Sequence, residues 1–341
     1  KFPEIEWHPL SGGWQRRVLP APRGIALASR FFSPLKSQFP VEDFLITKSP
    51  LAMGANPPLL DTNMVANEQA LAKLLSDDDP TTVLLVKEQL AAMAVDNPRL
   101  VEDLANGECP ATQRHAREIL HELQARDASD DFLLLCHLGG DRFDIEKAAW
   151  LLSRALLPEV PTAPSEELVN ECGIEFLSRI HGAVTNEDRI HLLGELLSGE
   201  LHFTGNADCY YCEENSLLPR LISTRKGIPI SLSLLYMMIG ARAGMKIDGI
   251  NLPGHFIARH GDLFFDPFHG GRILKREDLR SILSRQGIEL KDSHLQPASP
   301  RQFLMRILAN LLYVYDLDGD TERHGMVRTW MDALACGLVV K

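Results

Sequence analysis

The run of residues 230–243 constrains the fold most, because it is almost wholly apolar. Pro229 stands before it, where a proline suits the first helical turn, and Gly244 follows it as a natural C-cap. A helix that is apolar on all sides must be covered by other elements of the protein. We therefore expect this helix at the centre of the main core.

Three short segments after this helix have the composition of β-strands. They are residues 246–252, 255–260 and 263–268, with turn residues at Pro253-Gly254 and Gly261-Asp262 between them. A buried helix followed by antiparallel strands predicts an α+β core with a small antiparallel sheet.

The second turn predicts which side chains meet. If the loop is Gly261-Asp262, Arg259 lies opposite Phe264, and His255 and Asp266 share one face as diagonal neighbours. A four-residue loop keeps this parity, whereas a three-residue loop destroys it. We expect the side chains of His255 and Asp266 within hydrogen-bond reach, pointing toward the N-terminal end of the helix that begins near Pro229.

The strings Gly-Ile-Pro-Ile-Ser-Leu-Ser at 227–233, Pro-Gly-His-Phe at 253–256 and Asp-Pro-Phe at 266–268 occur in this order. This segment resembles the SirB-type transglutaminase-like family. The resemblance extends over about residues 132–334. It implies a SirB-type helical region, a transglutaminase-like (papain-like) core and a tetratricopeptide-like helical hairpin at residues 300–334.

Enzymes of this fold need a thiolate at the start of the buried helix, a His on a neighbouring strand and an Asp or Asn that orients it. His255 and Asp266 match two of these positions, but the enzyme motif Gly-x-Cys aligns with Gly227-Ile228-Pro229, and proline has no nucleophile. We therefore regard His255 and Asp266 as a vestigial or ligand-binding pair.

Other nucleophiles lie nearby in the sequence. Ser231 and Ser233 follow Pro229, but serine near a helix N-terminus is more often a hydrogen-bonding group of the main chain. Cys209 and Cys212 form a C-x-x-C motif, which is most often a pair of ordinary thiols, and otherwise half of a zinc site completed by His202 or His255, or a redox or nucleophilic site. Cys212 and Ser231 remain the candidate displaced nucleophiles.

Further polar residues near the core have ordinary interpretations. His260 and His269 neighbour glycines, so we expect them at the surface. Arg225 and Lys226 precede the buried helix, and they are expected to be solvated or to pair with carboxylates rather than to bind an anion.

The rest of the chain divides into three further parts. Residues 1–66, rich in Pro and Gly, predict an extended or poorly ordered arm with few core contacts, or alternatively a basic transit segment. Residues 67–126 predict HEAT-like helical hairpins that begin at Pro80 and Pro110. The SirB-type region and core then occupy 127–296, with helices at 144–157, capped by Asp144, at 165–181, capped by Ser165, and at 186–197. The C-terminal hairpin occupies 297–341.

The composition of the chain limits the kinds of partner and the location that we expect for it. The formal net charge of -11 disfavours nucleic acid and anionic membranes, and no apolar run approaches the roughly 20 residues that span a bilayer. The 6 cysteines of 341 residues do not form a disulfide framework, which favours a reducing, cytoplasmic location.

Two functions follow from these observations. The first is a non-catalytic protein that acts in protein binding or scaffolding, with an unidentified protein partner and no cofactor or metal. The second is a cysteine- or serine-dependent hydrolase or acyltransferase that uses His255 and Asp266 with Cys212, Cys209 or Ser231 as a displaced nucleophile. A structural zinc site at the C-x-x-C motif is a third interpretation.

Overall fold

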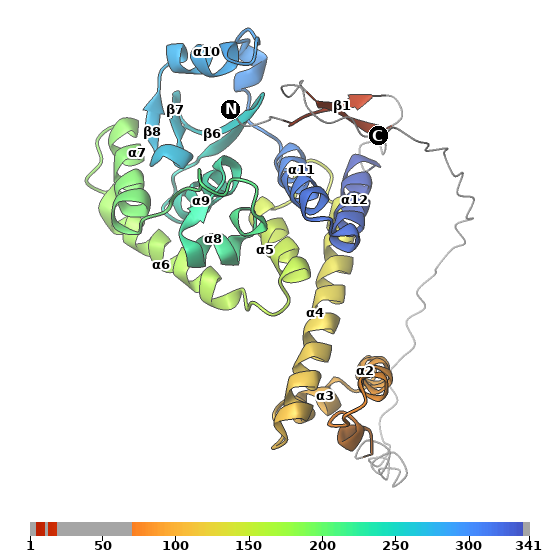
Figure 1. The fold of residues 1–341 in the computed structure, drawn as a ribbon. Coiled ribbons are helices and arrows are strands. Elements are labelled where there is room, and N and C mark those ends of the chain that lie inside the picture. The colour runs from red at the N-terminus through yellow and green to blue at the C-terminus, as the bar shows by residue number, and fades with distance from the viewer. Residues whose placement is uncertain (1–4, 11–12, 19–69, 337–341) are drawn as a thin grey trace, which may run out of the picture.

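The computed structural model describes residues 5–10, 13–18 and 70–336. Helices dominate the described chain, and a small antiparallel sheet forms one end of the main body (Figure 1). The predicted α+β class is therefore confirmed. Within the described residues, no helix is long and apolar enough to cross a membrane.

The two N-terminal segments form a β-hairpin. Strands β1 (Ile5–Leu10) and β2 (Gly13–Val18) pair antiparallel from Ile5 opposite Val18 to Leu10 opposite Gly13. Little regular structure was expected here, and that prediction is wrong for these segments, because two runs that can pair as strands follow each other closely in the sequence. Residues 19–69, most of the predicted arm, lie outside the described part of the chain.

A small helical lobe follows. Helices α2 (Pro80–Ala94), α3 (Pro98–Ala105) and α4 (Pro110–Leu138) each have a proline in the first turn, and Asp79 caps α2 by accepting from two backbone N–H groups. Their apolar faces make a core of their own. The helix starts at Pro80 and Pro110 were predicted, but α3 was not.

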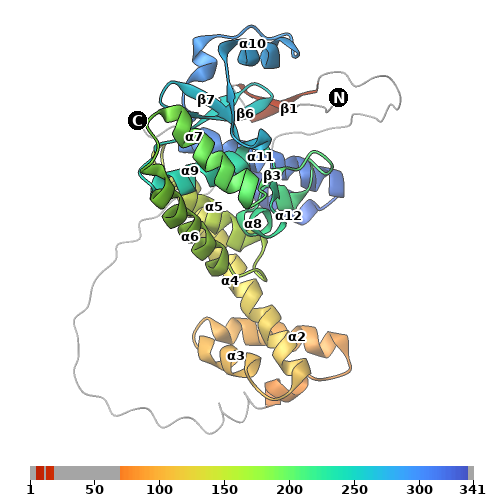
Figure 2. The ribbon, with the colours of Figure 1, turned by 90° about the vertical axis from the view of Figure 1, so that its left-hand side faces the viewer.

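Helix α4 runs from this lobe into the main body (Figure 2). Its 29 residues contain neither glycine nor internal proline, so nothing in its sequence ends the helix before Gly139-Gly140. The predicted boundary between residues 126 and 127 therefore falls inside one continuous helix. The edge of the Phe132 ring packs on Trp330, with centroids 4.9 Å apart, which fixes the end of α4 in the main core.

The main body begins with three helices. Helix α5 (Ile145–Leu156) is capped by Asp144, as predicted, whereas α6 (Ala163–Ile180) begins two residues before the expected cap Ser165 because Pro164 fits its first turn. Helix α7 (Asn186–Gly194) continues as the π-helix η1 (Glu195–Glu200). The described residues 70–200 are thus helical between their turns, as expected.

The predicted buried helix is α9, Pro229–Arg242. Before it lie β3 (Thr204–Gly205), the 3-10 turn η2 (Glu213–Asn215), α8 (Leu218–Thr224) and β4 (Lys226–Gly227), which pairs in parallel with β3. Helix α9 ends just before Gly244, whose φ of +71° is a conformation that glycine adopts readily.

A four-stranded antiparallel sheet covers α9. Its order is β5 (Asp248–Leu252), β6 (His255–His260), β7 (Leu263–Asp266) and β8 (Arg272–Leu274), of which β8 was not predicted. Phe256, Ala258 and Phe265 join the core around α9, whereas Ile257 packs in a second cluster with residues of α10 (Arg276–Ser284). The sheet therefore lies between two helices.

The chain closes with a helical hairpin. The 3-10 turn η4 (Asp292–Leu295) leads into α11 (Pro300–Asp318), and α12 (Thr321–Cys336) returns beside it. Ser299 and Gln302 form a capping box at the start of α11. Since α11 contacts α5 and α9, and α12 contacts α4, this predicted hairpin belongs to the main core.

Candidate functional site

The start of α9 carries Pro229 in its first turn, where the missing N–H of proline leaves no unpaired donor. Two residues later, the buried hydroxyl of Ser231 accepts a 3.1 Å bond from the N–H of Ile228 and donates a 2.5 Å bond to the carbonyl oxygen of Asn215. The hydroxyl of Ser233 donates to the carbonyl oxygen of Pro229 at 2.7 Å. Both serines therefore serve the main chain, as the structural interpretation expected.

The β6–β7 hairpin has the register that the Gly261-Asp262 loop predicts. Arg259 lies opposite Phe264, and the Nε2 atom of His255 lies 3.4 Å from Oδ2 of Asp266. Alternation along β6 puts His255 on the side of Ile257, which packs near α10. The pair thus lies where β6 begins and β7 ends, as the predicted register requires.

Asp266 has a second histidine partner that the sequence argument missed. Its Oδ2 accepts a 2.7 Å bond from Nδ1 of His269, and its Oδ1 accepts from the N–H of Phe268 at 3.0 Å. The 3-10 turn η3 (Pro267–His269) brings His269 back over the carboxylate. A proline directly after the aspartate, with a histidine at the third position, is the local signal that could have predicted this contact.

Burial shapes the electrostatics of this carboxylate, which is 2% exposed. Burial raises the pKa of Asp266, but the hydrogen bond and charge of His255, followed by those of His269, outweigh it, so the pKa lies below the ordinary aspartate value. Asp266 is therefore held as an anion that orients two imidazole rings.

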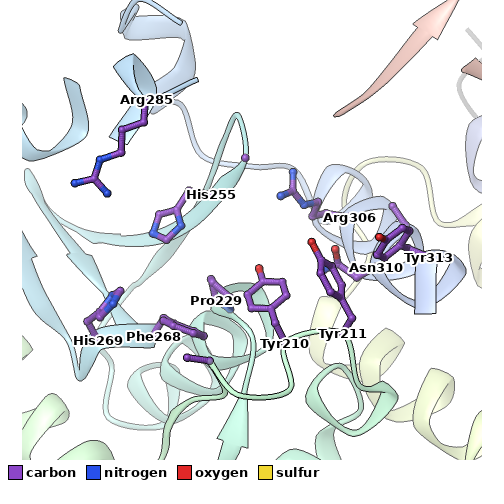
Figure 3. A pocket seen from close by; sticks show the side chains of 13 residues that line it. Tyr210, Tyr211, Pro229, His255, Phe268, His269, Arg285, Arg306, Asn310 and Tyr313 are labelled. Atoms are coloured by element: carbon purple, nitrogen blue, oxygen red, sulfur yellow. The ribbon is translucent and has the colours of Figure 1, made fainter. Parts of the chain in front are cut away.

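A cavity of about 440 Å³ opens beside these histidines. Pro229 and Gly254 line it together with both imidazoles (Figure 3). The cavity thus occupies the place where the start of the buried helix meets the His–Asp pair, as an active-site cleft would.

Aromatic rings form one wall of this cavity, from Phe268 through Tyr210 and Tyr211 to Tyr313. Neighbouring rings are in contact, with centroids 6.2, 5.1 and 4.8 Å apart in that order. The ring of Phe268 covers Gly205, where an added Cβ would lie 2.5 Å from three ring atoms. Each ring therefore limits the freedom of the next.

Basic and amide groups also line the cavity. Arg285 directly follows α10, and Arg306 and Asn310 project from α11 (Figure 3). Neither arginine was a candidate site residue in the sequence analysis, because neither is a sequence neighbour of His255: Arg285 follows α10 and Arg306 lies within α11.

Cys209 and Cys212 form a disulfide, with Cα atoms 5.8 Å apart. The expectation of ordinary thiols is wrong for this pair. The chain turns between β3 and η2, and this turn brings the two cysteine side chains together. The disulfide takes up both sulfurs that a nucleophile or a zinc site would use. The described residues also contain no group of three or more His, Cys, Asp or Glu arranged to hold a metal ion.

Other candidates from the sequence have structural roles. Arg225 adopts a left-handed conformation with its guanidinium 4.5 Å from the centroid of the Phe203 ring, and Lys226 pairs with Asp208 at 4.0 Å. His260 is buried, against expectation, because its Nδ1 donates a 2.8 Å bond to the carbonyl oxygen of Lys246. His202 has a positive φ of 60° and is not among the residues that line the cavity.

Comparisons with known proteins agree with this geometry. Residues 164–309, which contain α9, the sheet and most of the residues that line the cavity, match the family model of the transglutaminase-like superfamily. A UPF0162 protein of Xylella fastidiosa strain 9a5c is 32% identical over 192 residues, which cover 53% of this chain and 68% of that protein. The chain belongs to the UPF0162 family.

A UPF0162 protein of Pseudomonas aeruginosa is 29% identical to this family member over 182 residues, covering 51% of this chain and 66% of that protein. The human F-box only protein 21 is 26% identical over 149 residues, 40% of this chain and 23% of that protein. No solved structure matches the chain.

Proposed function

We propose that this UPF0162 protein is a non-catalytic transglutaminase-like protein that acts by binding another protein, with the cavity beside α9 as its recognition site. One observation carries the proposal. The residue at the start of α9 that lines the cavity is Pro229, and no Cys, Ser, Thr or Lys is among the described lining residues. The chemistry of the fold requires such a nucleophile beside the histidine.

The interactions around the site support binding rather than catalysis. Ser231 holds the main chain at the start of α9, and Cys209 and Cys212 are paired with each other. The Asp266 carboxylate then fixes two imidazoles beside a cavity whose described lining residues include no Cys, Ser, Thr or Lys for them to activate.

The helical parts around the core are consistent with a scaffolding role. We infer that the SirB-type helical region, the HEAT-like lobe and the tetratricopeptide-like hairpin of α11 and α12 offer further surfaces to a protein partner. A cytoplasmic location remains part of this proposal.

A binding experiment tests the proposal directly. Ala207 is an exposed residue of the cavity wall, so Ala207→Trp should fill the cavity with little effect on folding. In a pull-down, the intact protein should retain a partner protein that this variant does not bind. The control is Ala92→Trp on the exposed surface of α2, away from the cavity, which should retain it. Equal retention by both variants would remove the cavity from the proposed function.

The enzymatic alternative rests on the preserved His255–Asp266 pair together with the position of Cys209 and Cys212, which flank two tyrosines of the cavity wall. Reduction would free two thiols close to the site. Purified protein should therefore be assayed on ester and amide substrates with and without reductant. Turnover that disappears in His255→Ala would establish the enzyme and end the non-catalytic proposal.

A further inference from the structure

The cavity differs in charge from the protein that contains it. The chain carries a formal net charge of -11, yet the described residues that line the cavity include Arg285 and Arg306 and no Asp or Glu. Asp266 lies behind the histidines and already accepts three hydrogen bonds, from His255, Phe268 and His269. The charges that face the cavity are therefore those of the arginines.

The two arginines come from separate elements. Arg285 directly follows α10 and forms no ion pair with any residue in the described ranges, whereas Arg306 projects from α11. In the view of Figure 3, the two guanidinium groups lie on either side of His255. A planar guanidinium matches the two oxygens of a carboxylate, so this arrangement favours an anionic ligand group.

The aromatic part of the wall favours a ligand with a flat or apolar body. Tyr210, Tyr211 and Tyr313 present contacting rings, and Phe268 extends the same surface. The disulfide on either side of Tyr210-Tyr211 restrains this part of the wall. The volume of about 440 Å³ lies within the range of small-ligand sites, which is roughly 300–1,000 Å³.

We propose that this cavity binds a carboxylate carried on an aromatic or apolar body, with Arg285 and Arg306 on the carboxylate and the tyrosine wall on the body. The inference rests on the proposed function, because the terminal carboxylate and last side chain of a partner polypeptide have this chemistry. A free aromatic or aliphatic acid has it as well, so the experiment separates the two sources.

The test is a calorimetric titration of the full chain with N-acetyl-phenylalanine and, separately, with its amide. The acid should bind about tenfold or more tightly than the amide, because the amide lacks the charge that the arginines recognise. A peptide that ends in phenylalanine with a free carboxylate is the second arm. Tighter binding of this peptide assigns the site to a chain end, and equal binding assigns it to a small acid.

Matched variants test whether the two arginines bind the carboxylate. Arg285→Gln and Arg306→Gln should each weaken binding of the acid by about tenfold. The control is Arg280, which lies on α10 shortly before Arg285 and pairs with Glu277 at the surface. Arg280→Gln should leave binding of the acid unchanged. Equal affinity for acid and amide, no binding of the acid up to its solubility limit, or an equal loss in Arg280→Gln would overturn the inference. Tighter binding of phenyl phosphate than of the acid would overturn the choice of carboxylate.

The p-nitroanilide of N-acetyl-phenylalanine separates this inference from the proposed function. Its hydrolysis by the wild-type protein but not by His255→Ala would refute the non-catalytic proposal, while the comparison of acid and amide would still decide the ligand class.

Discussion

His255 donates toward Oδ2 of Asp266 across the β6–β7 hairpin, with 3.4 Å between the nitrogen and the oxygen. The same oxygen accepts a shorter bond, 2.7 Å, from His269. Because the carboxylate can only accept, each ring uses one N–H on Asp266 and has its other nitrogen available for the cavity. A single buried charge therefore orients both imidazoles.

Asp266→Asn should lower the free energy of unfolding by about 1.5–3 kcal/mol near neutral pH, the usual range for hydrogen bonds to a charged group. The pKa of Asp266 in the folded protein lies below the ordinary value, so its stabilising contribution is present above about pH 4 and is lost as the pH falls through the folded pKa. The difference between wild type and variant should shrink on acidification below about pH 4.

Urea unfolding at neutral pH and across the acid range measures this difference. Asp262→Asn, in the exposed turn of the same hairpin, is the control and should leave stability unchanged at each pH. A difference that stays constant across the acid range would show that Asp266 is not an anion held by the histidines.

Ser231→Ala tests whether this hydroxyl is structural. The change leaves the buried N–H of Ile228 and the carbonyl oxygen of Asn215 without their partner, which should cost about 1–3 kcal/mol. Ser233→Ala is the matched control and should cost clearly less, since Ser233 only adds a bond to a carbonyl of its own helix. Equal losses of unfolding free energy in the two variants would contradict the capping role.

Local signals in the sequence predicted the centre of the fold. An apolar run behind Pro229 marks α9, and the Gly261-Asp262 turn fixes the register of β6 and β7. Both features depend on neighbouring residues alone. The pairing of His255 with Asp266 follows from that register because side-chain direction alternates along a strand.

The remaining features depend on contacts between distant residues. Arg285 and Arg306 reach the cavity from different elements, and no pattern near either residue indicates this. The spacing of Cys209 and Cys212 allows a thiol pair, a metal site or a disulfide, and the fold of the intervening turn decides among them. The position of the end of α4 likewise depends on the contact of Phe132 with Trp330, which lies about 200 residues later in the chain.

The disulfide predicts a specific labelling pattern. In unreduced folded protein, an alkylating reagent should modify the exposed Cys109 and Cys336, and reduction should add Cys209 and Cys212. The buried Cys136 and Cys172 should react only after unfolding. Mass spectrometry of digested protein reads out each site. Labelling of Cys209 or Cys212 before reduction would mean that the pair exists as thiols.

Removing the disulfide should also lower stability. By loop-closure entropy, a loop of this length contributes about 2 kcal/mol, so Cys209→Ser with Cys212→Ser should reduce the free energy of unfolding by about that amount. The single variant Cys109→Ser, which changes an exposed free thiol, is the control and should leave the unfolding midpoint in urea where it is.

Pro229→Cys asks whether the site is an active-site cleft without its nucleophile. The substituted thiol would stand in the first turn of α9 and line the cavity with His255, where the helix dipole and a neighbouring imidazole both favour the thiolate. We expect this thiol to react with iodoacetamide at neutral pH faster than an ordinary cysteine does. The measurement uses a background of Cys109→Ser and Cys336→Ser, so that neither exposed free thiol of the described residues competes with the introduced thiol. Adding His255→Ala should slow the reaction, whereas adding Ser233→Ala, which leaves the imidazole in place, should not. A rate equal to that of Cys109 in the wild-type protein, with no response to His255→Ala, would mean that the start of α9 and the imidazole do not act on a common position.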